Sequence, residues 1–130
     1  MKITGLDHFQ IAMPAGGEAE ARHFYGRLLG MAEVDKPDPL ASRGGCWFEG
    51  PGFGLHLGVQ EAFVPAHKGH PAFLVGDVLT AARTLRAARV AVEFDHTLPQ
   101  VRRFYASDPF GNRLEFIQGG DGFSQQNITN

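Results

Sequence analysis

The fold is decided by a stretch that occurs twice, as EGPGFGLHL at residues 49–57 and as DPFGNRLEF at residues 108–116. The second copy begins 59 residues after the first. Each copy starts with an acidic residue, passes through a turn with proline and glycine, and ends in an apolar–polar–apolar alternation. That alternation is typical of a half-buried strand. The repetition therefore predicts a duplicated structural unit in which a tight turn leads into a strand.

The chain around the two copies repeats one order of elements. In the first half, strands are expected at residues 3–13, 32–36, 46–49 and 53–59, with a helical apolar stripe over 18–29. In the second half, strands are expected at residues 70–75, 91–94, 101–106 and 113–118, with a helix capped by Asp77. We therefore predict an α+β fold of two tandem βαβββ modules, about 3–59 and 69–118. They form one domain over residues 1–118, followed by a flexible tail at 119–130.

Composition limits the function classes. The 130 residues carry 12 Lys and Arg against 14 Asp and Glu, so a basic surface for nucleic acid is not expected. The apolar runs are shorter than the ~20 residues of a membrane helix, and no secretory signal pattern opens the chain. The single cysteine, Cys46, excludes an intramolecular disulfide and fits the cytoplasm. A small-molecule partner is the remaining expectation.

Chemistry-bearing side chains are expected on one face of the predicted sheet. Residues two apart in a strand share a face, and the apolar set of each strand should pack under a helix. The intervening residues then face a concave cup, and these are His8, Gln10, His56, His70 and Glu115. Neutral imidazoles and a carboxylate suit a borderline divalent metal, and two histidines with one carboxylate are typical of non-haem Fe(II) oxygenases. The pattern therefore predicts a metal site in the cup.

Three motifs carry a family resemblance: GLDH at residues 5–8, FYGRLLGM at 24–31 and DPFGNRLEF at 108–116. Over residues 3 to 118 the sequence resembles the vicinal oxygen chelate superfamily, which includes glyoxalase I, extradiol catechol dioxygenases, and fosfomycin- and bleomycin-resistance proteins. The resemblance implies paired βαβββ modules that form a U-shaped mixed sheet around a metal and substrate cup, with the helices outside. It also implies a homodimer.

Within the superfamily, the pattern of site residues is most similar to that of the extradiol dioxygenases. This resemblance implies that His8, His70 and Glu115 bind a divalent metal, with Fe(II) favoured and Mn(II), Ni(II) or Zn(II) as alternatives. It further implies that His56 is a catalytic acid/base. Tyr105, ten residues before Glu115, would be a catalytic hydrogen-bond donor.

Other residues are expected to contact the substrate. His96, nineteen residues before Glu115, matches another active-site histidine position of the extradiol pattern. Gln10 lies on the face of His8, and Arg103 on that of Tyr105, so both are predicted substrate contacts. Arg103 has the alternative of pairing with a structural carboxylate. Of Trp47 and Phe48, one should line the cup and the other the core.

Three functions remain open. The first is a metal-dependent dioxygenase acting on a vicinal diol. The second is a glyoxalase-like isomerase or lyase with His56 as a fourth ligand, although glyoxalase I typically has a carboxylate there. The third is a non-enzymatic protein that binds a drug or metabolite, like the bleomycin-resistance proteins.

Overall fold

The computed structural model describes residues 1–120. The chain divides into two compact units. Unit 1 consists of Met1–Ala66 together with Asp108–Asn112, and unit 2 of His67–Ser107 together with the chain from Arg113 onward. Each unit contains one four-stranded mixed sheet.

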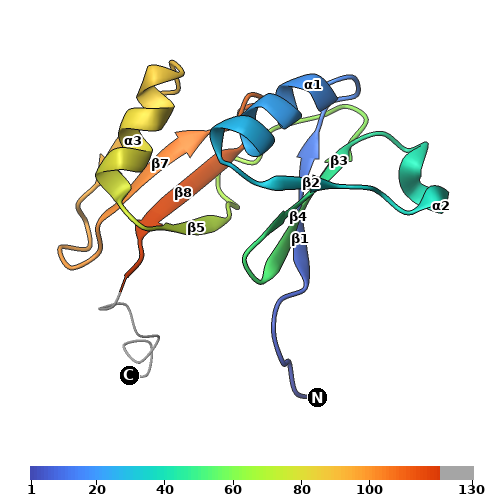
Figure 1. The fold of residues 1–130 in the computed structure, drawn as a ribbon. Helices are drawn as coiled ribbons and strands as arrows, with labels where there is room; N and C mark the ends of the chain where they lie inside the picture. The colour runs from blue at the N-terminus through green and yellow to red at the C-terminus, as the bar shows by residue number, and fades with distance from the viewer. Residues whose placement is uncertain (121–130) are drawn as a thin grey trace. The chain divides into compact units, whose positions relative to one another are not determined.

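Unit 1 contains the first predicted module (Figure 1). Its elements are β1 (His8–Met13), α1 (Glu18–Ala21), η1 (Arg22–Leu28), β2 (Ala32–Val34), α2 (Asp38–Ala41), β3 (Cys46–Gly50) and β4 (Phe53–Val59). The strand order is β1-β4-β3-β2, with β1 parallel to β4 and the other pairs antiparallel.

Unit 2 contains the second module. Its elements are β5 (Ala72–Val75), α3 (Val78–Ala87), β6 (Glu93–Asp95), β7 (Arg103–Ser107) and β8 (Arg113–Gln118). The strand order is β5-β8-β7-β6, again with one parallel pair, β5 and β8. The two halves thus have the same order and the same mixture of parallel and antiparallel pairs. The predicted tandem βαβββ modules of an α+β fold are confirmed.

Several boundaries differ from the sequence-based expectation. The first strand begins at His8 rather than at residue 3. The strand expected from residue 70 begins at Ala72, because Pro71 has no backbone N–H for a strand ladder, so His70 precedes the strand. The first helix passes after one turn into the π-helical segment η1, and Gly30, with φ +74°, follows its end. Residues 121–130 of the expected tail lie outside the described residues.

The predicted alternation of strand faces holds in both sheets. In unit 1 the buried face presents Ile11, Met13, Phe48, Leu55 and Leu57 to the helical segment, which contributes Ala21, Phe24 and Tyr25. In unit 2, α3 packs on β7 and β8; Val78, Ala82 and Leu85 of the helix are buried, as are Phe104, Leu114 and Phe116 of the strands. Asp77 caps α3 as predicted, since its carboxylate accepts hydrogen bonds from the backbone N–H groups of Leu79 and Thr80. The opposite faces of the sheets carry the polar residues.

A buried polar cluster joins the turn at residues 108–112 to the core of unit 1. One Asp108 carboxylate oxygen accepts from the backbone N–H groups of Phe110 and Asn112, both at 2.9 Å. The other accepts from the Tyr25 hydroxyl at 2.7 Å and the Asn112 amide at 2.9 Å. The Asn112 amide also donates to the Ala12 carbonyl at 2.8 Å. Four donors thus satisfy the buried carboxylate.

Replacing Tyr25 with phenylalanine is expected to destabilise the protein. Tyr25 is fully buried, and burial followed by the Asp108 carboxylate raises its pKa well above the ordinary value, so the hydroxyl stays protonated as a donor. Loss of a buried hydrogen bond to a charged acceptor costs about 1.5–3 kcal/mol of unfolding free energy. Urea unfolding measures this, with Tyr105→Phe as a half-buried control expected to lose less. An unchanged urea midpoint for Tyr25→Phe would contradict the role assigned to this hydroxyl.

Candidate functional site

A stack of three aromatic rings crosses the polar face of the unit 1 sheet. Gln10 on β1 and Trp47 on β3 are the register partners of His56 on β4. The Trp47 and His56 rings are parallel within 1° at a centroid separation of 3.8 Å. The His8 ring stacks on the same imidazole at 4.1 Å. Trp47 is therefore the residue of its pair that shares the face of His56, and Phe48 is the core residue.

Small residues on β4 make room for this stack. Gly54 and Gly58 are the neighbours of His56 on the same strand face. A Cβ atom at position 58 would lie 2.3 Å from the Gln10 amide nitrogen, so the Gln10 side chain occupies the space that this glycine leaves. A Cβ atom at position 54 would lie 3.1 Å from the His8 Cβ atom. The glycines thus let both side chains of β1 lie over β4.

The environment of His56 favours its neutral form. Desolvation, followed by repulsion from His8, lowers the pKa of His56 below its ordinary value. A neutral imidazole can accept a proton at neutral pH. His56 therefore has the charge state of a general base.

His8 is oriented by its sequence neighbour. Its Nδ1 atom lies 2.6 Å from a carboxylate oxygen of Asp7. A carboxylate acceptor fixes the proton on Nδ1 and leaves the Nε2 lone pair available, as in carboxylate–histidine–metal triads. Asp7 is a contributor that the sequence analysis did not single out, although a carboxylate beside a candidate ligand was a usable signal.

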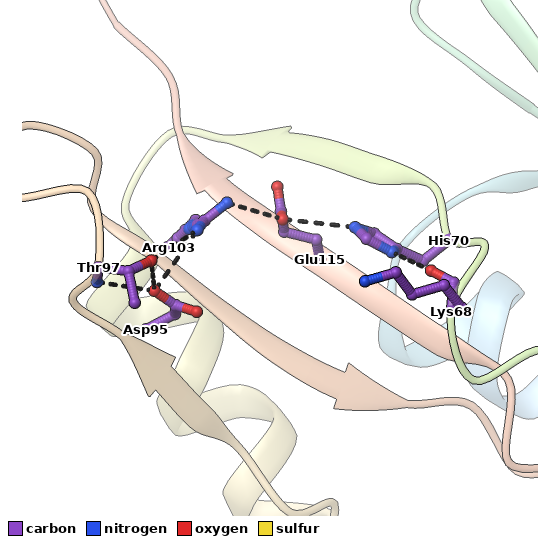
Figure 2. Close-up of polar contacts among 6 residues, drawn as sticks. All are labelled: Lys68, His70, Asp95, Thr97, Arg103 and Glu115. Carbon is purple, nitrogen blue, oxygen red and sulfur yellow. Dashed lines mark hydrogen bonds and ion pairs between the residues drawn. The ribbon is translucent and has the colours of Figure 1, made fainter.

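In unit 2 the buried carboxylate of Glu115 is the centre of a polar cluster (Figure 2). One of its oxygens lies 3.4 Å from His70 Nε2 and 3.3 Å from Arg103 Nη1. The side chain of Glu115 is 7% exposed. The structure brings His70 and Glu115 together, and His70 reaches Glu115 from the segment before β5, not from the strand itself.

The hydrogen bonds of His70 indicate what fits between it and Glu115. Its Nδ1 atom lies 2.9 Å from the Lys68 carbonyl oxygen, an acceptor, so Nδ1 carries the proton (Figure 2). In the neutral imidazole, Nε2 then presents a lone pair to the Glu115 carboxylate. Two lone pairs that face each other attract a cation between them. Imidazole and carboxylate are both common ligands of divalent first-row metals. The pair therefore fits part of a metal site.

Arg103 is held by carboxylates on both sides. Its Nη2 atom lies 3.4 Å from Asp95 and 3.2 Å from the Thr97 hydroxyl, while Nη1 contacts Glu115 (Figure 2). Thr97 in turn donates to Asp95 at 2.6 Å from its hydroxyl. Pairing with a carboxylate, one of the two alternatives for this arginine, is thus present in the structure.

Tyr105 lies on β7 directly opposite Glu115 on β8. Hydrogen bonding to Glu115, followed by desolvation, raises the pKa of Tyr105 above its ordinary value, so the phenol stays protonated at neutral pH. The His70 ring meets the Tyr105 ring edge-on at 5.4 Å, and the Arg113 guanidinium lies 4.0 Å above the ring centroid. Arg113 lies two residues before Glu115 on β8 and so shares its face, but the sequence analysis assigned it no role.

His96 and Gln10 are the remaining candidates. His96 follows β6, is exposed and has its ring parallel to that of Phe94 at 6.4 Å. Gln10 is exposed beside Gly58.

Over residues 1–120, no three His, Cys, Asp or Glu side chains form a group that could hold a metal ion. The predicted ligands occur instead as His8 in unit 1 and the His70–Glu115 pair in unit 2. In the same part of the chain, no helix combines the length and apolar character of a membrane span.

Comparisons with known proteins agree on one superfamily. Residues 5–116 match the family model described as the Glyoxalase/Bleomycin resistance protein/Dioxygenase superfamily. A solved glyoxalase family protein from Bacillus anthracis is 47% identical, with a TM-score of 0.88 over 92% of this chain and 98% of that one. No curated protein sequence matches significantly.

More distant solved structures share the fold. Lactoylglutathione lyase from Agrobacterium tumefaciens is 18% identical, with a TM-score of 0.71 over 92% of this chain and 96% of that one. TnmS3, an antibiotic-binding protein from Streptomyces sp. CB03234, is 23% identical, with a TM-score of 0.72 over 92% and 99%. At these identities the likeness is one of fold.

Proposed function

Because the chain belongs to the glyoxalase/bleomycin resistance/dioxygenase superfamily, we propose that it is a metal-dependent dioxygenase of the extradiol type that acts on a small vicinal diol. His8, His70 and Glu115 hold the metal in this proposal, with Fe(II) preferred over Mn(II), Ni(II) or Zn(II). The observation that carries it is the tethering of both histidines through Nδ1, to Asp7 and to the Lys68 carbonyl. This leaves both Nε2 atoms available as ligands.

The bound ion would supply Lewis acidity toward the two diol oxygens and, as Fe(II), the capacity to activate dioxygen. The chain's own residues do the rest. His56, whose lowered pKa keeps it neutral, accepts a proton from a substrate hydroxyl. Tyr105, protonated at neutral pH, donates a hydrogen bond to a substrate oxygen.

Arg103 has a positioning role in this proposal. Because its guanidinium contacts Asp95, Thr97 and Glu115, it holds the Glu115 carboxylate in one orientation. Gln10 and His96 are exposed, and substrate contact is the role proposed for both. A homodimer is the proposed assembly, because edge strands β1 and β5 each have one side without a strand partner within the described sheets.

Metal analysis followed by an oxygen-uptake assay tests the proposal. The protein is purified without chelator or metal-affinity resin, reconstituted with Fe(II) under nitrogen, and then exposed to catechols in air. We expect about one ion per chain and oxygen consumption that depends on both metal and catechol. Metal binding with isomerisation of an α-ketoaldehyde–thiol adduct, and without oxygen uptake, would support the glyoxalase-like alternative. Tight binding of small molecules by a protein that takes up no metal would support the binding-protein alternative.

A further inference from the structure

Two arginines on the polar face of the unit 2 sheet contact Tyr105, and their charges are balanced differently. Arg103 contacts Asp95 and Glu115. Arg113 is half-buried and, among the described residues, makes no ion pair and no side-chain hydrogen bond, and its guanidinium contacts the Tyr105 ring. Arg113 is thus the cation on this face that has no anionic partner.

The Tyr105 ring lies against the Arg113 guanidinium. Arg113 pairs with Ser107 across the sheet, which places it diagonally opposite Tyr105. At 4.0 Å from the ring centroid, the guanidinium is within cation–π range of the Tyr105 ring. The guanidinium N–H groups form a planar fork that matches the two oxygens of a carboxylate.

We propose that Arg113 binds a carboxylate group of the substrate. This inference rests on the proposed function, in which the diol end of the same substrate lies at Glu115. Arg113 and Glu115 are two residues apart on β8, so their Cα atoms are about 6.6 Å apart and their side chains face the same side. That separation matches one aromatic ring with substituents at opposite ends. The substrate class that follows is a vicinal diol on a ring that also carries a carboxylate.

None of the carboxylates on this face of the sheet is a counter-ion of Arg113 in the described residues. Arg103 and His70 surround Glu115, and the Asp95 carboxylate accepts from Thr97 and Arg103. Glu93 is opposite Tyr105 on β6, on the other side of β7 from Arg113. A bound carboxylate would therefore be the counter-ion of Arg113.

Binding of benzoate to the metal-free protein tests the anchor, with benzyl alcohol as the uncharged analogue. Resonances of the arginine side chains are followed by NMR, and affinity is measured by calorimetry. We expect benzoate, and not benzyl alcohol, to shift the Arg113 resonance saturably. Arg113→Met should weaken benzoate binding at least ~10-fold, since a charge-assisted pair is worth about 1.5–3 kcal/mol. Arg113→Lys, which keeps the charge without the planar fork, should also weaken it.

Arg102→Met is the matched control, because Arg102 is exposed and its replacement removes the same charge. An equal loss of benzoate affinity in Arg102→Met and Arg113→Met would show a general charge effect and overturn the anchor. Absence of a saturable shift with benzoate in the parent would overturn it as well.

Binding of the diol end of the substrate is tested in a separate experiment. With Fe(II) bound, 3,4-dihydroxybenzoate should bind more tightly than catechol, and Arg113→Met should abolish the difference. Because the benzoate experiment needs neither metal nor oxygen, its outcome is independent of the metal and oxygen-uptake assays. Metal-free protein that binds benzoate through Arg113 but never takes up metal would refute the dioxygenase function and leave the carboxylate anchor standing.

Discussion

Replacing Glu115 with glutamine is expected to abolish tight metal binding while leaving the protein folded. The proposed ligand set has one carboxylate, and an amide is a much weaker ligand for a divalent ion. Changes to residues that only orient ligands already cost about 10–100-fold in metal affinity, so loss of the ligand itself should cost more than ~100-fold. Calorimetric titration with Fe(II) under nitrogen, or with Mn(II) in air, measures the change.

Glutamine is the informative replacement because Glu115 is buried. Alanine would leave Arg103 Nη1 without its acceptor at position 115, so lost metal binding would be confused with lost stability, whereas the glutamine amide oxygen can still accept from Arg103. Urea unfolding of the metal-free variant separates the two effects. Glu93→Gln is the matched control, since Glu93 is an exposed carboxylate opposite Tyr105 in the same sheet. Equal metal affinity in Glu115→Gln and the parent would remove Glu115 from the ligand set.

The sequence predicted the fold because the modules repeat their local signals. Residues 49–57 and 108–116 each combine a turn with an alternating strand, and β4 and β8 occupy equivalent places in the two strand orders. The period of two then predicted which side of each strand is buried. Once a strand's apolar side is known, the facing of its polar residues is determined without reference to any other strand.

Contacts between strands were harder to predict, because they depend on register. Whether Trp47 or Phe48 faces the core could not be decided from the sequence, since both are large and apolar. The pairing of Trp47 with His56 decides it. The contact of Arg113 with Tyr105 likewise depends on the alignment of β7 with β8 across the turn. Local sequence gives faces, whereas register gives partners.

The histidines illustrate a second limit. Pro71 excludes His70 from the strand ladder, yet Nε2 still reaches Glu115 because the Glu115 N–H donates to the Pro71 carbonyl at 3.0 Å. That backbone bond continues the pairing of β5 with β8 beyond the end of the strand. A strand pattern was therefore the wrong local description of His70, although the residue predicted to be near Glu115 was the right one.

His56→Gln is expected to lower turnover by ~10²–10⁴-fold and to leave metal affinity nearly unchanged, if His56 is the acid/base of a dioxygenase. Glutamine keeps polar atoms in the gap between Trp47 and His8 but cannot take up a proton. The rate is followed as oxygen uptake with a catechol, and affinity as in the Glu115 experiment. His23→Gln is the control, because His23 is exposed on η1.

The same variant separates the three functions, because each gives His56 a different task. A fourth ligand, as in the glyoxalase-like alternative, would make His56→Gln lose metal affinity on the scale of Glu115→Gln, and that result would overturn the acid/base role. In a binding protein, or where His56 is a purely structural member of the stack, the change would leave metal affinity and any turnover unaltered. His56→Ala adds a chemical test, since free imidazole can enter the space that the missing ring leaves. Turnover should recover in part when imidazole is added, and the recovery should rise with the neutral fraction of the imidazole. That result would identify proton transfer as the contribution lost in His56→Ala. A loss of packing would not depend on the protonation of an added base.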